Sequence, residues 1–303
     1  MMKKGLLGIE ELAREEIEAI LDKARSFQPP PNERFQRFET LRGRSIINLF
    51  FEPSTRTRVS FEIAARRLGA EAVSIQAQAS SVSKGESLVD TLNTLVAMRP
   101  DAIVMRHSAS GAPHFLSRYL STPILNAGDG THEHPTQALL DARTILDHLG
   151  RLDGLRVAII GDIVHSRVAR SNIYLLSKFG VDIVLCGPAP LVPPALARIA
   201  PGVTIQHDIE EAIREADVIM MLRVQLERQH EPAMSAGEYF RFYGLQLDHV
   251  SRAKPGAIVM HPGPINRGRE ISSEVADSQS SVILNQVENG VAVRMAVLER
   301  ILA

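Results

Sequence analysis

The feature that most constrains the fold of this chain is a repeated alternation of short apolar runs with segments of helical periodicity. The apolar runs of the first half are predicted strands, at 45–51, 73–75, 101–106 and 123–127. Helices are predicted around them, at 9–24, 57–68, 86–98 and 135–149. The alternation restarts at 156–161 and continues to 257–260. Strands joined by helices pair in parallel, so the sequence predicts parallel sheets with helices on both faces.

The chain of 303 residues is long enough for two domains of ordinary size. The expected boundary is the sequence Gly-Arg-Leu-Asp-Gly at 150–154. We predict an α/β protein with two doubly wound parallel-sheet (three-layer αβα) domains and an active-site cleft between them. The first domain is predicted to span 1–149 and to be joined by the C-terminal helix 286–303, and the second to span 150–285.

Three less regular segments complete the expected organisation. Residues 77–86 are small and polar, and they predict a mobile loop. A helix is expected at 194–199, and the charged stretch 223–245 is expected to be irregular.

Composition excludes several classes of function. A net charge of −1 disfavours a general binder of nucleic acid, which needs a basic face. Arginine supplies 28 of the 34 cationic side chains, an excess that base composition or a hot habitat explains at most positions. The single cysteine, Cys186, cannot form an intrachain disulfide or a cysteine-rich zinc site. No apolar run is long enough for a membrane span or a signal peptide, so we expect a soluble, cytoplasmic protein.

A cluster of hydroxyl and guanidinium groups follows the first predicted strand. It reads Ser54-Thr55-Arg56-Thr57-Arg58 and opens a predicted helix. Backbone N–H groups and the dipole at a helix start favour an anion, and these side chains add donors that suit phosphate. Helix capping beside surface arginines is the plainer alternative, but it leaves the density of the cluster unexplained. The pattern favours a phosphate site.

Three more arginines follow or lie close behind predicted strands, namely Arg106, Arg167 and Arg223. Ligands of parallel sheets bind beyond the carboxyl ends of the strands, so together with Arg56 they predict a cleft for more than one anionic group. Arg106 taken alone is equally well explained by a surface salt bridge. Gly161 lacks the further glycines of a dinucleotide-binding turn, so no nucleotide is expected there.

The sequence HEHPTQ, from His132 to Gln137, stands at a predicted junction between a loop and a helix. Pro135 suits the first position of that helix. His132 and His134 are near one another, but their spacing and the lack of a supporting Cys or carboxylate pattern disfavour a metal. We therefore expect no metal and no cofactor. The functional interpretation of these histidines is that one of them polarises a carbonyl group of a ligand. The structural interpretation is a histidine that packs in the core or caps the helix.

Two further loops complete the candidate site. His261-Pro262-Gly263-Pro264 follows the last predicted strand, where two prolines and a glycine can fix a backbone that faces a cleft. A plain tight turn is the alternative. The loop 77–86 contains Lys84, which by itself would be a solvated lysine.

These motifs resemble those of the aspartate/ornithine carbamoyltransferase family over nearly the whole chain. F-x-x-x-S-T-R-T-R-x-S-F-E is matched between Phe50 and Glu62, and H-P-T-Q at 134–137. The sequences Lys-Gly-Glu at 84–86 and Arg-Val-Gln at 223–225 are similar to the aspartate-specific branch, the aspartate carbamoyltransferases. Ornithine-specific members carry a Cys in the motif that reads His-Pro-Gly-Pro here. The resemblance implies transfer of the carbamoyl group of carbamoyl phosphate to L-aspartate, giving N-carbamoyl-L-aspartate and phosphate, in de novo pyrimidine (UMP) biosynthesis.

The resemblance also implies a role for each matched residue. Carbamoyl phosphate would be bound by Ser54, Thr55, Arg56, Thr57, Arg106, His134, Gln137, Gly263 and Pro264. The catalytic residues among these would be Arg56, Thr57, Arg106, His134 and Gln137. L-Aspartate would be bound by Lys84, Arg167, Arg223 and Gln225. The departing phosphate can accept the proton of the attacking amine, so no protein base is assigned.

Finally, the resemblance implies a homotrimer with shared sites, in which Lys84 and either Ser80 or Ser81 come from the neighbouring subunit. It leaves open an association with dihydroorotase or with a regulatory chain. One alternative function is carbamoyl transfer to another amine such as ornithine, which Arg223 disfavours because it would repel a cationic side chain. The other is a non-catalytic anion sensor on the same fold, which would bind ligand without releasing phosphate.

Overall fold

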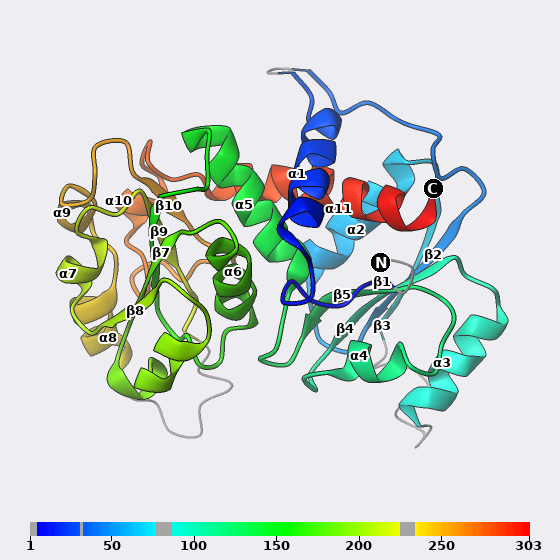
Figure 1. The fold of residues 1–303 in the computed structure, drawn as a ribbon, viewed down its shortest axis with the longest axis horizontal. Helices are drawn as coiled ribbons and strands as arrows, with labels where there is room; N and C mark the ends of the chain where they lie inside the picture. The colour runs from blue at the N-terminus through cyan, green and yellow to red at the C-terminus, as the bar shows by residue number, and fades with distance from the viewer. Residues whose placement is uncertain (1–4, 31–32, 77–86, 225–233) are drawn as a thin grey trace. The chain divides into compact units, whose positions relative to one another are not determined.

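The computed structural model describes residues 5–30, 33–76, 87–224 and 234–303. The chain forms two compact units, one of Met1–Leu140 with Glu288–Ala303 and the other of Asp141–Val287. Each unit is built on a five-stranded sheet whose paired strands are all parallel (Figure 1). The predicted α/β class with two parallel sheets is confirmed.

The sheet of the first unit has the strand order β1-β5-β4-β2-β3. Its strands are β1 (Gly5–Leu6), β2 (Ser45–Phe50), β3 (Glu71–Gln76), β4 (Ala102–His107) and β5 (Ile124–Asp129). β2, β4 and β5 are almost entirely buried, as expected for strands covered on both faces. After β2 the chain forms β3 on one side and then β4 on the other. The order therefore reverses between β2 and β4, the place where sheets of this kind bind ligands.

Helices cover this sheet on its two faces (Figure 1). They are α1 (Arg14–Phe27), α2 (Thr55–Arg67), α3 (Leu88–Ala97) and α4 (Ala112–Leu116). Apolar residues of α3 and α4 pack with β2, β4 and β5 in one buried cluster. α2 packs against β2 and β3. The C-terminal helix α11 (Ile283–Leu302) sends Arg294 to α2, where its guanidinium donates to the Ser60 hydroxyl at 2.9 Å and lies over the Phe61 ring.

The sheet of the second unit has the order β10-β9-β6-β7-β8. Its strands are β6 (Arg156–Ile160), β7 (Asp182–Cys186), β8 (Val203–Gln206), β9 (Val218–Met221) and β10 (Ile258–Met260). Its helices include α6 (Arg167–Ser177), α7 (Ile209–Ile213), α8 (Ala236–Tyr243), α9 (Leu247–Val250) and α10 (Ser273–Ala276). Residues of α7, α8 and α10 share one apolar core with β6, β7, β9 and β10. Here the strand order reverses between β6 and β9.

Two expectations for the second unit are wrong. The segment 194–199 is not an α-helix but a 3-10 turn, Pro194–Arg198, preceded by another at Ala189–Leu191. Its backbone hydrogen bonds reach back three residues, from the Leu196 N–H to the Pro193 carbonyl and from the Ile199 N–H to the Leu196 carbonyl. The stretch 223–245 is not irregular throughout, because α8 lies within it. α8 starts with a capping box in which Ser235 and Glu238 accept each other's backbone N–H.

The predicted helix at 135–149 is α5 (Pro135–Leu149), and the loop expected at 77–86 lies outside the described residues. The compact units divide within α5, after Leu140, and the predicted domain boundary at 150–154 stays a prediction. Among the described residues, no helix is long and apolar enough to span a membrane.

Candidate active site

The first candidate site lies where β2 ends, beside the strand reversal of the first unit. Ser54 is the N-cap residue of α2, yet its hydroxyl does not cap the helix, and the first turn of α2 holds no acidic side chain. The hydroxyl of a buried residue, Thr57, lies in that turn, and the Arg56 side chain is exposed. The helix start thus keeps its positive dipole end without a carboxylate of its own, which suits a bound anion.

Arg106 lies next to this helix start, because it pairs in register with Phe50 of β2. Its Nη1 donates to the Ala127 carbonyl at 3.2 Å, and its Nε lies 3.4 Å from Oε2 of Glu52. The side chain is 15% exposed. These contacts fix the guanidinium at the carboxyl ends of three adjacent strands, β2, β4 and β5.

His107, the next residue, has a supporting role. Its ring lies 4.9 Å from the Phe51 ring at an angle of 62°, and its Nδ1 accepts the Ala109 N–H at 2.9 Å. Burial lowers the pKa of His107, so the ring favours the neutral form that this hydrogen bond requires. The side chain therefore packs and caps the turn after β4.

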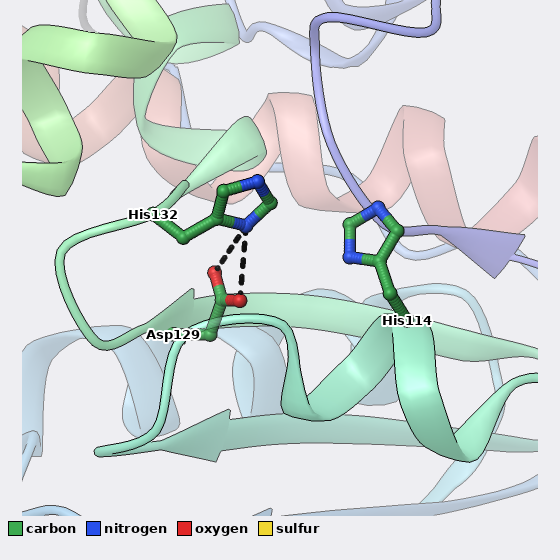
Figure 2. Close-up of side chains that lie close together, drawn as sticks. All are labelled: His114, Asp129 and His132. Atoms are coloured by element: carbon green, nitrogen blue, oxygen red, sulfur yellow. Dashed lines mark hydrogen bonds and ion pairs between the residues drawn. The ribbon is translucent and has the colours of Figure 1, made fainter.

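The loop after β5 is organised around the carboxylate of Asp129, which is fully buried. One oxygen, Oδ1, accepts the Asn126 amide at 2.8 Å and the Glu133 N–H at 3.0 Å, while Oδ2 accepts the Gly111 N–H at 2.6 Å. Nδ1 of His132 lies 3.0 Å from Oδ2 (Figure 2). Burial alone raises the pKa of this carboxyl, but the bonds from His132, Asn126 and the backbone outweigh it and hold the pKa below its usual value.

His134 and Gln137 follow directly, at the start of α5. Both are nearly buried, with 4% and 8% exposure, and the Gln137 N–H donates to the His134 carbonyl. The preceding carboxylate, Glu133, is also buried and accepts the Ile9 N–H at 2.8 Å and the Glu10 N–H at 3.2 Å. Two buried carboxylates, those of Asp129 and Glu133, therefore hold the loop that carries His134.

The second candidate site lies at the strand reversal of the other unit, after β6 and β9. Gly161 has a φ of +141°, and a Cβ there would press against Leu222. Ser166 caps α6 by accepting the Ala169 N–H at 3.1 Å, and Arg167 is the first residue of that helix, only 6% exposed. Arg223 lies two residues after the end of β9 and is half-buried. Two guanidiniums thus follow the two central strands of this sheet.

The loop after β10 is fixed by a buried histidine and a buried glutamate. Nδ1 of His261 accepts the Gly263 N–H at 2.8 Å, which places the ring proton on Nε2, 3.2 Å from Oε1 of Glu270. Glu270 also accepts the Asn266 N–H at 2.6 Å. The Gly263–Pro264 peptide between them is cis. Both ends of the Pro-Gly-Pro segment are therefore tied to one carboxylate.

A buried hydrogen-bonded chain extends from this loop into the core of the second unit. The His261 N–H donates to Oε1 of Gln286 at 2.9 Å, and Nε2 of Gln286 donates to Asp141 at 2.7 Å. The other oxygen of Asp141 accepts the Asn172 amide at 2.8 Å. The chain connects the loop with α5, α6 and α11.

Family models match the whole of this architecture. The carbamoyl-phosphate-binding domain of aspartate/ornithine carbamoyltransferases matches residues 4–147, and the Asp/Orn-binding domain of the same family matches residues 153–301. The chain belongs to the aspartate/ornithine carbamoyltransferase family.

Relatives within this family agree with the assignment. A protein of Solibacter usitatus named aspartate carbamoyltransferase catalytic subunit is 76% identical over 99% of this chain and 100% of its own length. An aspartate transcarbamoylase from Trypanosoma cruzi, solved with carbamoyl aspartate and phosphate, has a TM-score of 0.88 and 34% identity, and the match covers 99% of this chain and 96% of that one. An ornithine carbamoyltransferase from Thermus thermophilus has the same TM-score at 26% identity over the full length of both. The fold is thus common to members of both specificities.

The sequence-predicted residues that the structure describes lie near the carboxyl ends of the strands of the two sheets. Ser54 is the N-cap of α2, Thr55, Arg56 and Thr57 form its first turn, Arg106 lies in β4, and His134 and Gln137 lie at the start of α5. Arg167 is the first residue of α6, Arg223 lies on the loop after β9, and Gly263 and Pro264 lie on the loop after β10. The predicted contributions of Lys84, Gln225, Ser80 and Ser81 fall outside the described residues.

Sequence reasoning missed the carboxylates that hold these loops. Asp129, Glu133, Asp141 and Glu270 are all at most 1% exposed, and none of them belongs to the predicted substrate contacts. For Asp129 the available signal is a Gly-Asp pair where a predicted strand ends, at 128–129, which occurs again at 161–162. Two other buried groups are chemically quiet, since burial raises the pKa of the Cys186 thiol to about 12 and raises that of the Tyr239 phenol as well.

Proposed function

We propose that this chain is an aspartate carbamoyltransferase. It transfers the carbamoyl group of carbamoyl phosphate to the α-amine of L-aspartate and releases inorganic phosphate. The observation that carries the proposal is that arginines lie at both strand reversals, Arg106 with a hydrogen-bonded guanidinium in one unit and the buried Arg167 with the half-buried Arg223 in the other. One set suits a phosphate and the other suits a dicarboxylate, because guanidinium groups bind both kinds of anion in a bidentate way.

In this proposal the start of α2 binds the phosphate group. Its oxygens accept hydrogen bonds from Ser54, Arg56, Thr57 and the backbone of Thr55. Arg106 adds a second positive charge. Support comes from the uncapped, acid-free first turn of α2. Arg106 enters this site already ordered, since the Ala127 carbonyl and Glu52 hold its guanidinium.

The chemical step is nucleophilic attack on the carbonyl carbon. The amine nitrogen forms a bond to that carbon, the bond from carbon to the phosphate oxygen breaks, and the phosphate leaves with the electron pair and accepts the amine proton. Thr57, Arg106 and His134 stabilise the negative charge that develops on the carbonyl oxygen. Gln137 and the backbone of Gly263 and Pro264 orient the carbamoyl NH₂. Catalysis then depends on positioning and charge, with no covalent intermediate.

L-Aspartate binds to the second set of residues. Arg167 takes the α-carboxylate, and Arg223 with Gln225 takes the side-chain carboxylate, with Lys84 as a further cation. Support for the dicarboxylate comes from charge, because a cationic ornithine side chain would lie against Arg223.

The proposal extends to assembly and to cellular role. The enzyme acts in the cytoplasm as a homotrimer whose sites are shared, with Lys84 supplied by a neighbouring subunit, and its product enters pyrimidine biosynthesis. A mixture of Lys84→Ala and Arg56→Ala chains tests the shared site. Activity should reappear on mixing, because one site type in the hybrid trimer has both residues. No recovery, when exchange of subunits is demonstrated, would leave the site within one chain.

The decisive experiment follows product and phosphate together. The purified chain is given carbamoyl phosphate with L-aspartate or with L-ornithine, and the ureido product and inorganic phosphate are both measured. We expect equal amounts of both products with aspartate and neither above background with ornithine. Turnover with ornithine alone would replace aspartate by ornithine as the substrate. Binding of carbamoyl phosphate without phosphate release would support an anion sensor instead.

A further inference from the structure

Three side chains that the proposed reaction does not use converge beside the loop that carries His134. His114 comes from α4, Asp129 ends β5, and His132 lies in the loop that follows (Figure 2). One donor atom from each lies within 4.8 Å of the other two. The imidazole rings are 5.2 Å apart, at an angle of 75°.

The carboxylate of this cluster is prepared to carry a charge. Asp129 is fully buried, and the hydrogen bonds from Asn126, Glu133 and Gly111 fix both of its oxygens. In the described part of the chain its one ion-pair partner is His132, with Nδ1 at 3.0 Å from Oδ2. A buried carboxylate needs a paired positive charge, and either a protonated imidazole or a metal ion can supply it.

His114 provides the observation that a simple ion pair does not explain. Its Nδ1 is buried, and within the described residues it has no hydrogen-bond partner. Its Nε2 lies 3.6 Å from Oε1 of Glu11, so Nδ1 is the nitrogen available on the side of the cluster. Figure 2 shows a ring nitrogen of His114 facing Asp129 and His132. A carboxylate behind the far nitrogen is the usual second partner of a metal-bound histidine.

We propose that His114, Asp129 and His132 bind one divalent transition-metal ion of the Zn²⁺ type. The ligands are Nδ1 of His114, Oδ2 of Asp129 and Nδ1 of His132, and water completes four-coordination. The ion takes the place of the proton that Nδ1 of His132 donates to Asp129, and the neutral ring then carries its proton on Nε2. Two imidazole nitrogens select Zn²⁺, Co²⁺ or Ni²⁺ over Mg²⁺ and Ca²⁺, which prefer oxygen ligands.

The site would act as a brace rather than as a reaction centre. It would connect α4 to the segment from Asp129 to His132, and His134 is only two residues further on. The inference does not depend on the proposed transferase activity, because metal binding can be measured without substrate.

The chain contains a matched control for this site. In the second unit, Nδ1 of His165 lies 2.8 Å from Oδ1 of Asp162, again three residues apart. The side-chain exposures of the two pairs are nearly the same, 27% and 0% for His165 and Asp162 against 29% and 0% for His132 and Asp129. Among the described residues, however, no second imidazole joins the pair to make a three-ligand group. If a histidine–aspartate pair were enough to bind the metal ion, the His165–Asp162 pair would bind it as well.

The test measures metal binding directly. The full chain is stripped with a chelator and titrated with Zn²⁺ by calorimetry and with Co²⁺ by visible absorption, which reports four-coordinate nitrogen and oxygen ligation. We expect one tight ion per chain. His114→Ala should weaken binding by at least about a hundredfold, and Glu11→Gln by about tenfold. His165→Ala should leave affinity and stoichiometry unchanged.

A thermal scan gives a second readout and checks the fold of each variant. With Zn²⁺ at a hundredfold excess over its Kd, the midpoint of the parent chain should rise by about 5 °C, and that of His114→Ala should not move. Equal affinities of the parent and His114→Ala chains would overturn the proposal and assign any bound ion to surface groups. Loss of binding in His165→Ala would overturn it as well, and so would a parent chain that binds no ion.

Discussion

Strand β5 ends in Gly128-Asp129 and β6 is followed by the similar sequence Gly161-Asp162, and each buried aspartate is followed three residues later by a histidine that contacts it. The surroundings differ. Asp129 also accepts hydrogen bonds from Gly111 and Asn126, so it ties three segments together. Both bonds that Asp162 accepts from His165 go to one oxygen, Oδ1.

The comparison shows how one local device can serve two sites. In the first unit the turn leads to His134, which must be held against a reacting carbonyl group in the proposed mechanism. In the second unit it leads to Arg167 at the start of α6, which in the same proposed mechanism binds a carboxylate.

The largest effect is expected in the phosphate site of the first unit. Arg56→Ala should lower kcat by about a thousandfold, since it removes charge that stabilises the transition state. The Arg56 side chain is exposed, so the thermal midpoint of the variant should stay within about two degrees of that of the parent chain, as is usual for a surface substitution. Arg66→Ala, in the last turn of the same helix, is the matched control and should retain full activity. A fully active Arg56→Ala chain would contradict the phosphate role.

The second unit should respond in KM rather than in kcat. Arg223→Ala should raise the KM for aspartate by about a hundredfold, the effect of one lost charge-assisted pair of hydrogen bonds. The Kd for carbamoyl phosphate should change by less than about threefold, because Arg223 is not among the groups assigned to that ligand. Steady-state kinetics and equilibrium binding check both values. A change confined to carbamoyl phosphate would reverse the assignment of the two units.

The two aspartates can be compared through stability. Asp129→Asn should lower the free energy of unfolding by about 3 kcal/mol, because an amide group would face a backbone or amide N–H that now has an acceptor. Asp162→Asn should cost about half of that, since an asparagine retains Oδ1 for His165. Urea unfolding of both variants gives the two values. Equal losses would mean that the two turns are braced to the same degree.

The smallest effect concerns pH. The pKa of His107 lies below its ordinary value of 6.5 in the folded chain, so below that pH the unfolded chain binds the proton first. The free energy of unfolding should therefore fall as the pH is lowered through this range, by under about 1 kcal/mol because the half-exposed ring is screened by solvent. His107→Gln should flatten that part of the profile. An unchanged slope would assign it to other groups.

Much of the candidate site could be predicted because parallel strands obey strict rules. Apolar runs locate the strands, and their carboxyl ends locate the loops that matter, so Arg106 and Arg223 are conspicuous in the sequence alone. The helix start at Ser54 follows from the same reasoning. The position of α8 was missed because the charge of its surroundings hides a capping box and two buried tyrosines.

The supporting groups could not be predicted, because their partners are distant in the sequence. Gln286 reaches Asp141 across 145 positions, and no local pattern indicates that contact. His114 is similar, since it meets His132 only through the packing of α4 beside β5. The partners of buried polar groups are set by the assembled fold, whereas the ends of strands can be predicted from the local sequence.

The bonds from Ile9 and Glu10 to Glu133 have a practical consequence for anyone who prepares this protein. The neighbouring Gly8 lies so close to that carboxylate that a Cβ would collide with it. A shortened preparation that lacks residues 8–10 would therefore lose two donors to the carboxylate next to His134. Weak activity of such a preparation would reflect a disturbed loop rather than a wrong assignment of the residues in the proposed mechanism.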